Sequence, residues 1–152
     1  MIELFKRRRK DEVFGEIRFG RTFGIIGAGF WDGQVEFLPL EKQVKVRVAS
    51  GVSGPTQAQR EFFIELENRY INIAGHIREV LLKTPLKYFG SDFFGKLMPE
   101  LDWRDFELDA VGIEKIQSSQ HRWSLSFCHA PMTVSYSVNF DGWTPIQGEL
   151  DD

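Results

Sequence analysis

The strongest constraint on the fold is an amphipathic stretch between Gly54 and Pro85. Its apolar side chains recur every three or four residues, at Phe62, Leu66, Tyr70, Ile73, Ile77 and Leu81. This spacing places them on one face of an α-helix. Thr56 and Gln59 are spaced as in a capping box at its start, and Pro85 predicts its end. About 27 residues at ~1.5 Å each form a rod of ~40 Å, so we expect this helix to organise the domain.

Patterns typical of β-strands lie on both sides of this helix. Before it, alternation of apolar and polar residues occurs in VFGEIRF, QVEFL and KVRVAS; after it, in FELDAVGIEKI, RWSLSFCH and TVSYSVNF. We therefore predict an α+β fold, in which an antiparallel β-sheet from N- and C-terminal strands packs on one long central α-helix. Residues 13–152 would form this single domain, and residues 1–12 a basic, flexible N-terminus.

The composition of the chain argues against several classes of protein function. A chain of 152 residues is one ordinary domain, and its single cysteine, Cys128, excludes a scaffold held by internal disulfides. A net charge of −3 argues against general nucleic-acid binding. No apolar segment follows the basic start as it would in a secretory signal, so we expect a cytoplasmic protein.

The basic start offers one route to a membrane. Five cations at positions 6–10 follow Ile2, Leu4 and Phe5, which would supply an apolar anchor. The longest nearly apolar run, 23–31, is far shorter than the ~20 residues that span a bilayer. We expect a solvated terminus, with membrane association as the lesser alternative.

The stretch FGIIGAGFWDGQVEF, residues 23–37, has the glycines of a dinucleotide-binding loop. Such a loop needs a helix after its glycines, because the pyrophosphate sits on that helix's N-terminus. Here the glycines are followed by a strand pattern, and the pair Asp32-Gly33 is typical of a hairpin turn. We therefore reject a dinucleotide site and predict a β-hairpin whose Phe30 and Trp31 pack on the long helix.

The sequence contains no strong catalytic or metal-binding motif. Cys128 is adjacent to His129, but neighbouring residues of a strand face opposite sides of a sheet. His121 and His129 would lie ~26 Å apart along a straight strand, and His76 is alone on the helix. We assign no catalytic, cofactor-binding or metal-ligating residue, and we expect no cofactor.

The best candidate for a binding site is the acidic, aromatic stretch MPELDWRDFELDAVGIE. Its carboxylates beside a tryptophan suit a basic protein partner, because complementary charge speeds encounter and tryptophan is a frequent anchor of interfaces. The alternative is a solvated loop whose tryptophan fills the core. The predicted partner-binding residues are Asp102, Trp103, Asp105, Glu107 and Asp109.

Several motifs resemble those of a family of small bacterial domains of unknown function. These are DEVFGEIRFG, then GFWDGQVEF, then a helix start with Gln57, Gln59 and Phe62. The resemblance covers most of the chain, although the C-terminal FDGWTPIQGELDD matches only loosely. Related families occur beside polymorphic-toxin genes and are thought to act as immunity proteins. The resemblance implies no catalytic residues.

We therefore expect a non-enzymatic protein-binding domain, an immunity protein that occludes the active site of a basic toxin. A small-molecule-binding protein or small enzyme is the alternative. It would use the serine-rich sheet face, with His121 or His129 beside Ser124, Ser126, Ser135 and Ser137. A third reading is a subunit that oligomerises through exposed aromatic side chains.

Overall fold

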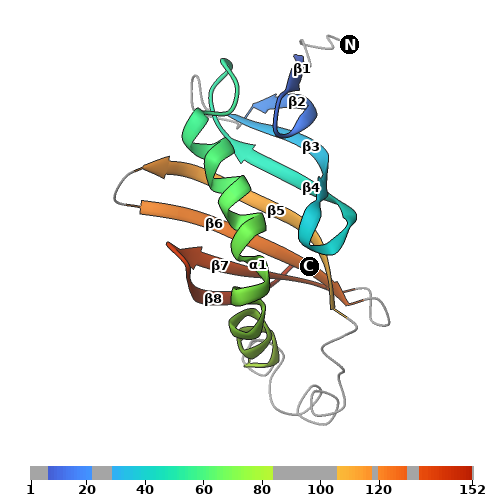
Figure 1. Cartoon of the computed structure of the whole chain (residues 1–152), viewed down its shortest axis with the longest axis vertical. Coiled ribbons are helices and arrows are strands. Elements are labelled where there is room, and N and C mark those ends of the chain that lie inside the picture. Colours follow the sequence, from blue (N-terminus) through green and yellow to red (C-terminus); the bar gives the residue numbers. More distant parts are fainter. Residues whose placement is uncertain (1–6, 22–28, 84–105, 118–119, 130–133, 152) are drawn as a thin grey trace.

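A computed structural model describes residues 7–21, 29–83, 106–117, 120–129 and 134–151 (Figure 1). In these residues one long helix packs on a mainly antiparallel eight-stranded sheet, which confirms an α+β fold. The elements are β1 (Arg8–Asp11), β2 (Gly15–Arg21), β3 (Gly29–Phe37), the 3-10 helix η1 (Leu38–Leu40), β4 (Lys42–Ala49), α1 (Gln57–Lys83), β5 (Phe106–Gln117), β6 (Gln120–His129), β7 (Val134–Asp141) and β8 (Thr144–Asp151).

The order of strands in the sheet is their order in the chain. All neighbouring strands are antiparallel except β4 and β5, which pair in parallel between Lys45–Val48 and Ala110–Ile113. A parallel pair needs a long connection, and that connection includes α1, which crosses one face of the sheet (Figure 1). Four strands therefore precede the helix and four follow it.

The helix matches its sequence pattern closely. It spans the 27 residues of α1, and the side chains of Phe62, Leu66, Tyr70, Ile73 and Ile77 are buried against the sheet. The predicted capping box is present: the Gln59 backbone N–H donates to Thr56 Oγ1 (3.2 Å), and the Thr56 N–H donates to Gln59 Oε1 (2.9 Å).

Aromatic rings dominate the core between α1 and the sheet. Phe63 on the helix contacts Phe14 and Phe37, with ring centroids 5.3 and 6.1 Å apart. Trp123 stacks on Phe140 at 3.9 Å, and its indole N–H donates to the Gly142 carbonyl. Because alternate residues of a strand face opposite sides, the sheet presents one apolar face to α1 and one polar face away from it.

The predicted hairpin turn at Asp32-Gly33 is wrong. Both residues lie inside β3, and the chain turns instead through η1 and Glu41, which has a left-handed φ of 49°. Glycine is favoured at position 33 by packing, since a Cβ there would meet the Ile17 side chain at 2.8 Å. Trp31 is buried as expected, whereas Phe30 faces away from α1.

Two further strands differ from expectation. Residues Arg8–Asp11, predicted to belong to a flexible start, pair with β2 as β1. The last strand, β8, was not predicted as one, because Pro145 and two acidic residues weaken its pattern. None of the helical residues that the structure describes forms a segment long and apolar enough to cross a membrane.

Candidate binding surface on the open face of the sheet

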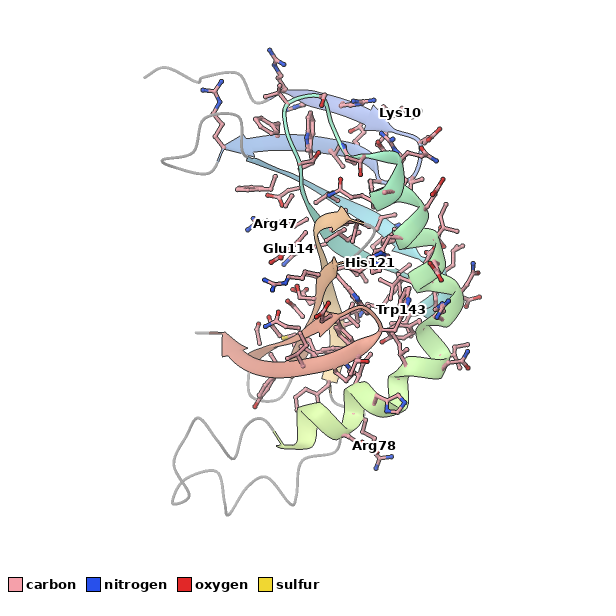
Figure 2. All side chains as sticks on the ribbon, turned by 90° about the vertical axis from the view of Figure 1, so that its left-hand side faces the viewer. Lys10, Arg47, Arg78, Glu114, His121 and Trp143 are labelled. Atoms are coloured by element: carbon pink, nitrogen blue, oxygen red, sulfur yellow. The ribbon has the colours of Figure 1, made fainter. Side chains whose placement is uncertain are left out.

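The face of the sheet that α1 does not cover is the candidate binding surface, and we call it the open face. Figure 2 shows Arg47 and Glu114 on this side of the sheet, and His121 and Trp143 on the side of α1. Alternation explains the division, because Val44, Val46 and Val48 of β4 are buried beneath the helix while the residues between them are exposed.

Arg47 is the most strongly organised side chain of the open face. Its Nε and Nη2 donate to Asp32 Oδ1 and Oδ2 at 2.7 and 3.0 Å, a bidentate pair between neighbouring strands. Its guanidinium also lies 4.2 Å from the centroid of the Phe30 ring. The hydrogen bonds to Asp32 raise the pKa of Arg47, so this side chain is a fixed cation.

The ring of Phe30 packs over Gly20, a glycine on the adjacent strand β2. A Cβ at Gly20 would come within 2.6 Å of the Phe30 ring, so only glycine leaves room for the ring to lie across β2. Gly20 in β2, Phe30 and Asp32 in β3 and Arg47 in β4 thus form one connected unit across three strands. We call these four residues the arginine platform.

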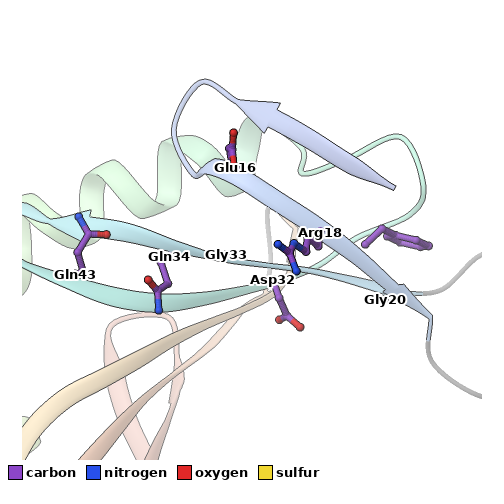
Figure 3. Close-up of a pocket in the computed structure, with 8 residues that line it drawn as sticks. Glu16, Arg18, Gly20, Asp32, Gly33, Gln34 and Gln43 are labelled. Atoms are coloured by element: carbon purple, nitrogen blue, oxygen red, sulfur yellow. The ribbon is translucent and has the colours of Figure 1, made fainter. Parts of the chain in front are cut away.

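A depression of about 790 Å³ lies beside the arginine platform, over β2, β3 and the start of β4 (Figure 3). It presents a guanidinium, carboxylates and amide groups, which suit hydrogen bonding to a polar partner. The residues that line it are Glu16, Arg18, Phe19, Gly20, Asp32, Gly33, Gln34 and Gln43. Arg18 lies opposite Asp32 in the register, but both oxygens of Asp32 already accept hydrogen bonds from Arg47.

The acidic residues predicted from the sequence fall only partly within the described chain. Asp102, Trp103 and Asp105 lie outside the described residues. Glu107 and Asp109 lie in β5, beside the basic strand β4.

Each of these two carboxylates faces a lysine. Glu107 Oε2 is 3.6 Å from Lys42 Nζ, and Asp109 Oδ2 is 3.4 Å from Lys45 Nζ. All four side chains are at least one-third exposed, so water screens the pairs and each contributes little to stability. The acidic residues of β5 therefore lie beside cations of β4, and this part of the sheet is not uniformly acidic.

The serine-rich half of the open face lies over β6 and β7. Ser126 and Ser137 are opposite each other, with their Oγ atoms 3.0 Å apart, and Gly112 in β5 is crowded by Ser124. His121, one of the two histidines that the small-molecule alternative places there, instead packs its ring on Phe62 of α1. The side chain of His129 lies outside the described residues.

The remaining site predictions concern the cysteine and possible metal ligands. Cys128 is half-buried on β6 and is a free thiol. No group of three or more metal-binding side chains is present within the described parts of the chain. Sequence reasoning missed the arginine platform because it treated Asp32 and Gly33 as a turn; the alternation in β4 was the pattern that could have placed Arg47 on the open face.

Comparisons with protein-family models, with curated proteins and with solved structures found no match for this chain.

Proposed function

We propose that this chain is a non-enzymatic protein-binding domain that docks a protein partner on its open face, and that it acts as an immunity protein against a toxin. The observation that carries the proposal is the arginine platform. Arginine and aromatic side chains are enriched among residues that dominate binding energy, and rigid ones lose little entropy on binding. Here Arg47 makes a bidentate pair with Asp32 and lies over the Phe30 ring, for which Gly20 leaves room.

The charges around the platform support a protein partner. Cations and anions alternate across β3, β4 and β5, so a complementary surface would have to match several signs at fixed spacings. Such patterns favour specificity, because a wrong partner meets like charges. The segment with Asp102, Trp103 and Asp105 leads directly into β5, so we include these residues with Glu107 and Asp109 in the proposed interface.

The proposed role as an immunity protein is supported by the resemblance of DEVFGEIRFG and GFWDGQVEF to domains related to immunity proteins. An immunity protein needs a stable scaffold and a complementary surface. We expect co-expression with a toxin encoded beside its gene to rescue growth of the host. Absence of rescue from every neighbouring toxin, with the chain well expressed, would remove the immunity function.

The test of the open face compares two arginines in similar settings. Arg47→Gln removes the platform's cation, and Arg69→Gln removes an arginine that pairs with Glu65 and lies 4.7 Å from the Trp143 ring, on the side of α1. We expect Arg47→Gln to weaken binding to the toxin that the chain neutralises about ten-fold or more. Arg69→Gln should weaken it by less than about two-fold. Equal effects would show that the open face is not the interface.

A small-molecule site is the second candidate, favoured by the 790 Å³ depression beside Arg18. Its volume is within the range of ligand pockets. If it binds a metabolite, a thermal-shift screen of charged metabolites should yield a hit whose stabilisation is lost in Arg18→Ala. A hit that survives this substitution would exclude the depression as its site.

A further inference from the structure

A second surface lies at the edge of the helix, away from the open face. Four of its apolar side chains are exposed: Leu38 by 64%, Leu40 by 40%, Ile64 by 47% and Ile71 by 77%. Isolated exposed apolar residues are common, but a cluster of them marks an interaction site. With Glu67, these four residues form what we call the helix shoulder.

One carboxylate brings the shoulder together. Glu67 lies three residues after Ile64 and four before Ile71, so all three are on the same side of α1. Glu67 Oε1 accepts a hydrogen bond from the Leu38 backbone N–H at 3.0 Å, which fixes η1 against this part of the helix. This hydrogen bond therefore brings η1 next to the part of the helix that carries Ile64 and Ile71.

The two isoleucines are not required by the helix itself. The stripe that packs on the sheet runs through Leu66, Tyr70 and Ile73, and neither Ile64 nor Ile71 is in it. Isoleucine is also a poorer helix former than the alanine, glutamate or lysine typical of exposed positions. Their presence on an exposed side of α1 thus has no local structural explanation.

Among the described residues, the carboxylates at the shoulder are not in ion pairs. They are Glu67 and the two that flank η1, Glu36 and Glu41. Partial burial raises the pKa of Glu67, and the negative charge of Glu36 raises it further. Of the arginines of α1, Arg60 is paired with Asp11 and Arg69 with Glu65.

We propose that the helix shoulder binds an amphipathic protein segment that carries both apolar side chains and a lysine or arginine. The apolar residues would cover Leu38, Ile64 and Ile71, and the cation would pair with Glu67. This site is separate from the open face and goes beyond the proposed immunity function. It would give the chain a second protein contact at the same time as the first.

Charge selects this occupant over others. An anionic membrane or nucleic acid would be repelled by these three carboxylates. A second copy of the chain, meeting this surface with the same surface, would place glutamates against glutamates. A cationic amphipathic segment satisfies both the apolar and the acidic groups.

The test uses a designed peptide as its probe. A helical peptide of about 14 residues, with leucines on one face and lysines beside them, is titrated into the isotope-labelled chain and followed by NMR. We expect saturable shifts at Leu38, Ile64 and Ile71. A matched peptide with glutamates in place of the lysines should leave these signals unchanged.

Variants at the exposed Ile71 and the half-buried Glu67 sharpen the result. Ile71→Ser should weaken peptide binding about ten-fold and Glu67→Gln about five-fold, whereas Val52→Ser, an exposed apolar residue elsewhere, should change nothing. Arg47→Gln should also leave peptide binding unchanged, which separates this site from the open face. Equal binding of both peptides, shifts confined to other regions, or self-association abolished by Ile71→Ser would each overturn the proposal.

Discussion

Arg60 of α1 reaches the buried Asp11 of β1, and its Nη2 donates to Asp11 Oδ2 at 2.8 Å. The Asp11 side chain is fully buried, and its other oxygen accepts the backbone N–H groups of Val13 and Phe14. One carboxylate therefore closes the β1–β2 turn and ties the edge of the sheet to the helix. This contact explains why residues expected in a flexible start form a strand.

Asp11 should make stability depend on acidic pH. Burial opposes its ionisation, but the hydrogen bonds from Arg60, Val13 and Phe14 outweigh it and lower the pKa below 3.8. A carboxyl group whose pKa is lower in the folded chain than in the unfolded chain stabilises the fold at pH values above its unfolded-state pKa. This stabilisation is lost as the pH falls from the unfolded-state pKa through the folded-state pKa. Urea unfolding from pH 7 to 3 should therefore show a loss of stability below about pH 4.

Asp11→Asn should flatten this acid dependence. It should also destabilise the chain by about 2–4 kcal/mol at pH 7, because Arg60 loses its buried carboxylate partner and keeps only the exposed Glu12, 3.8 Å away. An unchanged slope between pH 5 and 3 in this variant would show that other carboxylates control acid unfolding.

Gln59 should be among the most sensitive polar positions. Its side chain is buried, and its amide donates to the carbonyls of Ala49 (2.8 Å) and Glu114 (3.1 Å) while accepting from Thr56. Gln59→Leu would leave three backbone groups without this partner and should cost about 2–4 kcal/mol in unfolding free energy. Gln57→Leu, which replaces an exposed glutamine two residues earlier, should cost less than about 0.5 kcal/mol.

Tyr70 should control stability at alkaline pH. Burial raises its pKa to about 12, above the ordinary value of 10.0. Because the pKa is raised, the contribution of Tyr70 to the free energy of unfolding is complete below pH 10 and is lost as pH rises toward 12. Spectroscopic titration should show a tyrosinate with a midpoint near 12 that Tyr70→Phe removes, while Tyr136, whose pKa is also raised by burial, remains in that variant. A midpoint near 10 would contradict the burial of this ring.

Gly20 should tolerate no side chain while Phe30 is present. Gly20→Ala places a methyl group 2.6 Å from the Phe30 ring and should destabilise the fold by about 1–2 kcal/mol. In a Phe30→Ala background the same substitution should be nearly neutral, and a double-mutant cycle of unfolding free energies measures the coupling. Additive costs would show that the ring moves away from Gly20 easily.

Gly75 provides the opposite case. It lies in the middle of α1, and a Cβ at this position would meet no atom within 4 Å. Gly75→Ala should therefore stabilise the chain by about 0.5–1 kcal/mol, because alanine loses less conformational entropy in a helix. Thermal denaturation of the two proteins checks this, and a lower midpoint for the variant would reveal contacts with parts of the chain outside the described residues.

The helix was predictable because its information is local. The stripe from Phe62 to Ile77 and the Thr56–Gln59 capping box depend only on spacing, and both are present. The prediction of a turn at Asp32-Gly33 was wrong because the reason for this glycine is not local. The glycine is needed for close contact with Ile17 on another strand, a tertiary requirement that produces the same letters as a turn.

The site was less accessible to sequence analysis because it combines residues from three strands. Arg47 could be assigned to an exposed face from alternation alone, but its contact with Phe30 depends on the register between β3 and β4. The pairing of Glu107 and Asp109 with lysines depends on a parallel alignment that only the crossover through α1 creates. No local pattern encodes that alignment.

The parallel junction of β4 and β5 has a consequence for how the chain folds. Every other pair of adjacent strands is joined by a short connection, so each group of four strands can form at little entropic cost. The junction instead joins residues 65 positions apart, such as Lys45 and Ala110. We expect it to form late, so that two preassembled halves meet across it, with Gln59 bonding to both sides as they close.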